Sequence, residues 1–221
     1  MRKLLASLFA GGLLLAVGLG IYAQAQSPGV NSNLAQVWDI PLDSIKRTYA
    51  VGIDGFVVAS SPTTYWQLCG SATSTVRVTQ VTIAGRQTTA AHADFQILKT
   101  STAATGGTIT ALAPFSSAAI VGIPYDTGFA AGTAKVTAWS ANPTIGTSLG
   151  AVWSGQLFLG NLTTTQSNSG AVVTFGNRPG SALVLRGTAQ CMAIDSTATN
   201  TGTVGPGSGN LMDITTEWTE E

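Results

Sequence analysis

The feature that most constrains the fold is an alternation of apolar and polar residues with period two, which recurs from residue 56 to the C-terminus. In HADFQILK, Ala93, Phe95 and Ile97 share one face and the intervening polar residues share the other. Side chains of a β-strand point alternately to opposite faces, so this pattern predicts half-buried strands. It recurs in TAKVTAWS, GAVWSGQLFLG, GAVVTFG, SALVLRGTAQCMAID and NLMDITTEWTEE, with turn-forming clusters between them.

Eight or nine short strands without helical periodicity predict an all-β fold, an antiparallel β-sandwich that is jelly-roll-like. The composition agrees, because 31 threonines and only 9% charged residues favour pleated sheets over helices. Residues 181–195 are expected to form one strand. Its small residues, from Gly187 to Ala193, would let a facing sheet or a neighbouring subunit approach closely.

One predicted strand, STVRVTQVTIAG, carries a local irregularity. In a regular strand Val76 and Val78 would face away from Val81 and Ile83. One extra residue at positions 79–80, a β-bulge, returns all four to one face. A strand that is buried on both faces explains the same run, and the sequence leaves both interpretations open.

The N-terminal quarter differs from the rest. Residues 1–25 have the pattern of a signal peptide: Arg2 and Lys3, a long apolar stretch, and small residues before the expected cleavage point. The apolar stretch is long enough to serve as a membrane anchor helix if it is not cleaved. Residues 26–55 lack steady alternation and are expected to form an extended arm, which leaves residues 56–221 as the β-sandwich domain. The protein is therefore expected to be exported: periplasmic, secreted or on the cell surface.

The residue types give no sign of catalysis. The single histidine, His92, shares a strand face with Asp94, but the sequence has no G-x-S-x-G motif to supply a nucleophile. The cysteines and the histidine match no zinc spacing, the acidic residues are too scattered for a calcium loop, and no phosphate-binding loop occurs. We expect no catalytic residue, metal or cofactor. The net charge is zero and there is no basic cluster, so no nucleic-acid partner is expected either.

Four aromatic residues are candidates for a ligand-facing surface: Tyr65, Trp66, Trp139 and Trp153. Such rings stack on the apolar faces of sugars. Packing in the core or between subunits is the favoured interpretation of the same residues.

The two cysteines could form a disulfide in an exported protein, closing a loop of about 120 residues. Cys69 and Cys191 lie in apolar strands, YWQLCG and AQCMAI, where a thiol also packs well as a small hydrophobe. A bridge requires the two strands to be neighbours. We expect two free, buried thiols.

Several strings resemble small structural or functionally unassigned proteins of tailed bacteriophages and prophages: LCGSATSTVRVTQVTIAG, ILKTSTAATGGT, TAWSANPT, GQLFLG, FGNRPGSALVLRGTAQ and DITTEWTEE. The likeness keeps the same order from about residue 50 to residue 221. It implies a virion-associated β-sandwich, an accessory of capsid or tail, and no activity. The export signal departs from this pattern, since virion proteins normally assemble in the cytoplasm.

The sequence thus predicts a non-enzymatic structural or surface-displayed protein that associates with copies of itself or with other virion or surface proteins. The alternative is a secreted module that binds glycan through exposed aromatic residues. Contact with a membrane is expected only through residues 1–25, if they are not cleaved.

Overall fold

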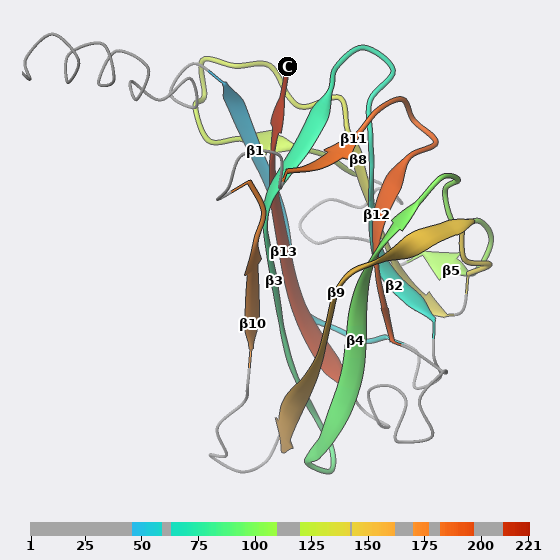
Figure 1. The fold of residues 1–221 in the computed structure, drawn as a ribbon. Coiled ribbons are helices and arrows are strands. Elements are labelled where there is room, and N and C mark those ends of the chain that lie inside the picture. The colour runs from blue at the N-terminus through green and yellow to red at the C-terminus, as the bar shows by residue number, and fades with distance from the viewer. Residues whose placement is uncertain are drawn as a thin grey trace, which may run out of the picture. The chain divides into compact units, whose positions relative to one another are not determined.

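The computed structural model describes residues 46–58, 63–109, 120–141, 143–161, 170–176, 182–196 and 210–221. Every regular element in these ranges is a β-strand (Figure 1). The prediction of an all-β chain is confirmed for this part of the protein. The expected signal or anchor helix at residues 1–25 lies outside the described residues. Within them, no helix is long and apolar enough to span a bilayer.

The described ranges contain thirteen strands. In chain order they are β1 (Arg47–Phe56), β2 (Thr64–Cys69), β3 (Val76–Gln87), β4 (Ala91–Thr100), β5 (Thr108–Ile109), β6 (Ile120–Val121), β7 (Ile123–Pro124), β8 (Lys135–Ala141), β9 (Ser148–Asn161), β10 (Ala171–Thr174), β11 (Leu183–Leu185), β12 (Cys191–Ser196) and β13 (Leu211–Glu220). The compact unit begins at Lys46. The last nine residues assigned to the arm, 47–55, therefore belong to the sheet, because β1 forms a ladder with β13 and buries Tyr49 and Val51.

Ten of these strands form one curled sheet, in the order β5-β8-β2-β12-β4-β9-β3-β13-β1-β7. Outside this path, β10 and β11 pair with β3, and β6 pairs with β8. The ladders of the described part are antiparallel except where β3 meets β9. There Arg86 and Gln87 pair in parallel with Gly160 and Asn161. The sheet is therefore mixed, and the expectation of purely antiparallel strands is wrong at this contact.

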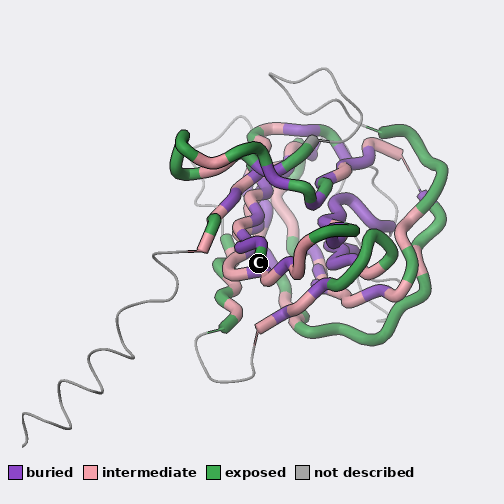
Figure 2. Tube along the Cα trace, turned by 90° about the horizontal axis from the view of Figure 1, so that it is seen from above, coloured by how far each residue is buried: buried purple, intermediate pink, exposed green. Residues whose placement is uncertain are grey.

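The curled sheet encloses a single apolar core. Strands that are distant in the sheet order meet across it: Trp66 of β2 donates its Nε1–H to Thr216 Oγ1 of β13 at 2.8 Å. The ring of Trp66 also lies 6.4 Å from that of Phe56 on β1. Figure 2 shows the buried segments crossing the middle of the unit, with exposed segments around them. Burial of these apolar faces is the main force that stabilises the fold.

Of the two interpretations of the run at residues 74–85, the β-bulge in β3 is confirmed. Val78 pairs with Trp218 and Gln80 pairs with Glu217, so Thr79 is an extra residue that has no partner on β13. The shift returns four apolar side chains to the core side, where all are buried: Val76, Val78, Val81 and Ile83.

The single strand expected at residues 181–195 is two strands. β11 pairs with β3, whereas β12 pairs with β2 and β4 in the other half of the sheet. Gly187 begins the turn between them at φ +68°, a conformation that glycine adopts without strain. Residues 187–189 therefore lie in an exposed turn, and among the small residues only Cys191 and Ala193 are buried against neighbours.

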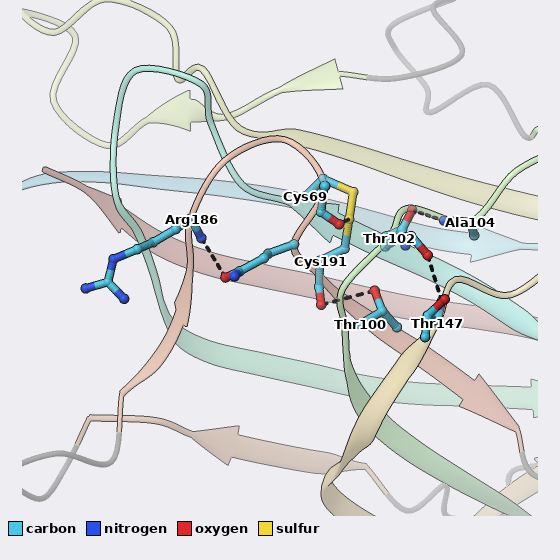
Figure 3. Close-up of a disulfide and its surroundings, with 10 residues drawn as sticks. Cys69, Thr100, Thr102, Ala104, Thr147, Arg186 and Cys191 are labelled. Atoms are coloured by element: carbon cyan, nitrogen blue, oxygen red, sulfur yellow. Dashed lines mark hydrogen bonds between the residues drawn. A yellow bond between two sulfur atoms is a disulfide. The ribbon is translucent and has the colours of Figure 1, made fainter.

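Cys69 and Cys191 form a disulfide (Figure 3), so the expectation of free thiols is wrong. The two residues are directly paired on β2 and β12, with their Cα atoms 4.0 Å apart. The fold thus supplies the neighbouring strands that a bridge requires. On the other side of β12, Thr100 of β4 donates its hydroxyl to the Cys191 carbonyl oxygen at 3.4 Å.

The carboxylate of Glu220, at the end of β13, holds the segment that leads into β8. It accepts hydrogen bonds from the Thr133 N–H and hydroxyl, from the Ala134 N–H at 3.0 Å and from Trp218 Nε1–H at 3.1 Å. Burial raises the pKa of Glu220, but these hydrogen bonds outweigh burial, and the pKa lies below its ordinary value. An ionised Glu220 is therefore part of the folded state.

Candidate interaction surface

The four candidate aromatic residues do not form a surface for a ligand. Tyr65 and Trp66 are fully buried, and the side chain of Trp139 is only 3% exposed. These three rings are packed inside the protein, so they are not placed to stack on a sugar. Trp153, on β9, is partly exposed at the margin of the core.

His92 and Asp94 share the outer face of β4, as the alternation predicts, but each has its own partner on β9. The ring of His92 lies 5.3 Å from that of Phe158. Asp94 Oδ1 accepts a hydrogen bond from Gln156 Nε2 at 3.1 Å. In the described ranges, no three His, Cys, Asp or Glu side chains come together in a group that could hold a metal ion.

A buried polar cluster lies where β2 begins and β12 ends: Thr64, Tyr65, Asp195 and Ser196, each at most 3% exposed. The hydroxyls of Tyr65 and Ser196 are hydrogen-bonded at 2.5 Å. Asp195 Oδ1 and Thr64 Oγ1 have no hydrogen-bond partner of ordinary geometry. Burial raises the pKa of Asp195 to about 6, and the facing Thr64 hydroxyl offsets part of that rise. Asp195 therefore changes charge not far below neutral pH.

The candidate interaction surface is the edge of β9 away from β4, called its free edge below because, over Ser148–Leu157, no other described strand pairs with it. Ser148–Leu157 pairs with β4 along one edge. Along the other edge, β3 joins β9 only at Gly160 and Asn161 within the described part. The register against β4 skips Leu149 and Val152, which are the extra residues of two bulges. A bulge re-aims its extra residue, and these two side chains are 61% and 45% exposed.

Two glycines permit this irregular strand. Gly150 has φ +128°, where other residues would be strained. Gly155 leaves room for the ring of Trp153, because a Cβ at that position would lie 2.5 Å from Trp153 Cζ2. The indole therefore lies along its own strand and packs against the margin of the core.

β10 forms a second free edge, because the described chain pairs it with β3 alone. β10 and β9 pair with the same edge of β3, because β13 occupies the other edge, and in Figure 1 they run as separate ribbons. Its Val172 is 64% exposed. Among the described residues, five apolar side chains border the core and are partly exposed, and four of them lie on β9, on β10 or just after β10. The core is therefore least well covered along these two strands. The five are Ile53, Trp153, Ala171, Val173 and Phe175.

Neither free edge carries a charge: Ser148–Leu157 and Ala171–Thr174 contain no Lys, Arg, Asp or Glu. Proteins commonly guard exposed edges with charges, proline or bulges. The two bulges guard only the first half of β9. From Trp153 to Leu157 its pairing with β4 is regular, and no other described strand pairs with the opposite edge over these residues.

The sequence predicts GAVWSGQLFLG to be a strand but does not reveal its free edge. A local signal does exist in SLGAVWSG, where Leu149, Val152 and Trp153 break the period-two pattern between glycines. Whether such a break leaves a strand unpaired depends on the rest of the sheet.

Comparison with known proteins finds no relative: no family model matches the chain, and no curated protein or solved structure is significantly similar to it.

Proposed function

We propose that this chain is a non-enzymatic structural protein, exported or displayed at a surface, that associates with copies of itself. The observation that carries this proposal is that β9 and β10 each have an uncharged edge with which no other described strand pairs over most of its length, beside partly exposed residues that border the core. An edge strand presents unpaired N–H and C=O groups that a further strand can satisfy. Burial of the neighbouring apolar side chains adds to the stability of such a contact.

One further observation supports an exported role. The Cys69–Cys191 disulfide fits an oxidising compartment, in line with the signal pattern of residues 1–25. The narrower proposal, an accessory of a phage capsid or tail, rests on the resemblance of the sequence strings alone. The glycan-binding alternative gains nothing from Tyr65, Trp66 or Trp139, because these rings are buried.

We also propose that the curled sheet is a variant of the jelly-roll sandwich. A jelly roll is a long antiparallel ladder rolled up, so its first strand pairs with its last and its second with its second last. The pairing of β1 with β13 and of β2 with β12 supports this assignment. β3 continues the series with β11, also in antiparallel pairing, whereas its parallel contact with β9 lies outside the series. β8 departs from the series, since it lies beside β2.

Sedimentation velocity over a concentration series tests the proposed function, with protein purified from the periplasm of an expressing bacterium. We expect oligomers whose proportion rises with concentration. A monomer at every concentration would overturn the proposal. A pull-down on polysaccharides separates the two functions, because a structural protein should not be retained and a glycan-binding module should.

A further inference from the structure

We infer that the end of β12 farthest from the disulfide, Asp195 and Ser196, is a pH-sensitive device: it stays closed while Asp195 is protonated and opens locally when Asp195 is ionised. The opening separates these two residues from β2 and β4 and leaves the rest of β12 in place. It does not depend on the self-association proposed above.

Buried polar groups without partners gather beside this end of β12. In the described ranges, three such atoms lie on the β2–β12 ladder: Thr64 Oγ1, Gln67 Nε2 and Asp195 Oδ1. Thr64 pairs with Asp195, and Gln67 pairs with Ala193, two residues before Asp195, so the three side chains share one face of the ladder. Each of the three residues is at most 3% exposed. A buried polar group without a hydrogen bond is destabilising, so an opening that admits water to all three requires less free energy here than elsewhere in the ladder.

The protonation state of Asp195 decides whether the end stays closed. An ionised carboxylate only accepts hydrogen bonds, whereas a protonated carboxyl also donates one. In the closed cluster, the donor that faces Asp195 is the Thr64 hydroxyl. The amide of Gln67 is directed to the segment after β4, because its Oε1 accepts the Ala104 N–H at 3.2 Å. Two carboxylate oxygens thus share one facing donor, and burial raises the pKa of Asp195 to about 6. The closed cluster therefore suits a protonated Asp195 better than an ionised one.

In the described part of the chain, no charge faces Asp195 to compensate its ionisation. β2 contains no charged residue, and the pKa of its Tyr65 is raised to about 12, mainly by burial, so the phenol stays neutral. β4 places Gln96 opposite Asp195, whereas its charged residues, Asp94 and Lys99, are paired with β9 and with the middle of β12. No titratable side chain occurs in the neighbouring segments of the sequence, residues 59–62 and 197–209.

The disulfide confines the opening to one end of β12. Cys191, the first residue of the strand, is held by the bridge, and Met192 and Ile194 belong to the core. At the other end, the Ser196 N–H donates to the Thr63 carbonyl oxygen at 3.1 Å. Release of this end breaks that bond and leaves the core contacts of β12 intact.

Amide hydrogen exchange followed by NMR, with the disulfide intact, tests this device. The Ser196 N–H reports on the opening, and the Gly70 N–H, which donates to the Gln190 carbonyl oxygen at 2.9 Å beside the disulfide, is the matched control at the other end of the ladder. After correction for intrinsic exchange, the opening constant of Ser196 should rise by up to about 100-fold from about pH 4 to pH 8, because the pKa values of 3.8 and about 6 differ by about two factors of ten. At pH 8 it should exceed that of Gly70 and should not depend on low concentrations of urea, since a local opening exposes little surface.

Substitutions show whether Asp195 causes the effect. Asp195→Asn should remove the pH dependence of the Ser196 opening constant, and Asp94→Asn, on the outer face of β4, should leave it unchanged. Thr64→Val should enlarge the rise, because the ionised carboxylate loses the hydroxyl that faces it. The device is absent if the wild-type opening constant of Ser196 is the same at both pH values, if its rise persists in Asp195→Asn, or if exchange of Ser196 at pH 8 requires urea-dependent unfolding.

Discussion

Replacing Asp195 with asparagine should stabilise the protein at neutral and alkaline pH. The Asp195 side chain is 3% exposed, one of its oxygens has no hydrogen-bond partner, and none of the described ion pairs involves it. It faces Thr64 on β2 and Gln96 on β4, neither of which is charged. Tyr65 is the titratable neighbour, but its pKa is raised to about 12, mainly by burial, so the phenol stays neutral.

The expected change in the unfolding free energy follows from the pKa of Asp195. Burial raises it from 3.8 to about 6 in the folded protein. The folded state therefore binds the proton more tightly than the unfolded state. The unfolding free energy is highest at pH values below the unfolded-state pKa of Asp195, and it falls as pH rises through the folded-state pKa. A difference of about 2 pKa units corresponds to about 3 kcal/mol. Asparagine is neutral throughout, so Asp195→Asn should raise the unfolding free energy by about 3 kcal/mol near pH 8 and change it little near pH 4.

Urea denaturation at about pH 4, 6 and 8, with the disulfide intact, measures this difference. The melting temperature near pH 8 should rise by roughly 6–12 °C for a domain of this size. Asp94→Asn is the control, because Asp94 is bonded to an exposed amide on the sheet surface and should change stability by less than about 0.5 kcal/mol. An Asp195→Asn variant that is equally stable or less stable at pH 8 would refute the reasoning, since it would mean that the ionised carboxylate has a favourable partner.

Three other substitutions test the fold. Glu220→Gln should lower the unfolding free energy by about 2–3 kcal/mol near pH 7, as charge-assisted hydrogen bonds are lost. Because the pKa of Glu220 is lowered, this difference should be present above its ordinary pKa of 4.5 and disappear as pH falls below it, in denaturation curves at several pH values. Replacing both Cys69 and Cys191 with serine should destabilise by up to about 4–5 kcal/mol, since the bridge spans 122 residues, and thiol titration of denatured, unreduced wild type should find no reactive group. Gly155→Ala should cost about 1–3 kcal/mol and alter tryptophan fluorescence, because the new methyl group collides with Trp153; unchanged fluorescence would contradict the described ring position.

Features that depend on one strand and one core face could be predicted from the sequence. Ala93, Phe95 and Ile97 alternate with polar residues because β4 has one face against the core, and all three are buried. For β3 the same reasoning reduced the choice to two, a bulge or a strand buried on both faces, and the structure decides for the bulge. Val78 and Val81 must both reach the core, and an odd spacing allows that only through an extra residue.

Features that depend on which strands become neighbours could not be predicted. Cys69 and Cys191 are 122 residues apart, and their local sequences suit a free thiol as well as a bridge. Only the placement of β12 beside β2 decides between them. The turn at Gly187 could not be predicted either, because small apolar residues before and after it continue the alternation of a strand.

The first half of β9 could not be predicted for two reasons: it lacks a core face, and its edge depends on which strands are its neighbours. This segment is part of the candidate interaction surface. No core face enforces alternation at Leu149 and Val152, so bulges are tolerated there and both side chains reach solvent. Beyond them, Ser154 and Gln156 are exposed, so a lysine at either position would guard the edge without disturbing the core. A chain that gained from remaining monomeric could acquire such a charge at little cost in stability. The self-association proposed above predicts that Gln156→Lys, placed on this uncharged edge, lowers the proportion of oligomers in sedimentation velocity without lowering the unfolding free energy by more than about 0.5 kcal/mol.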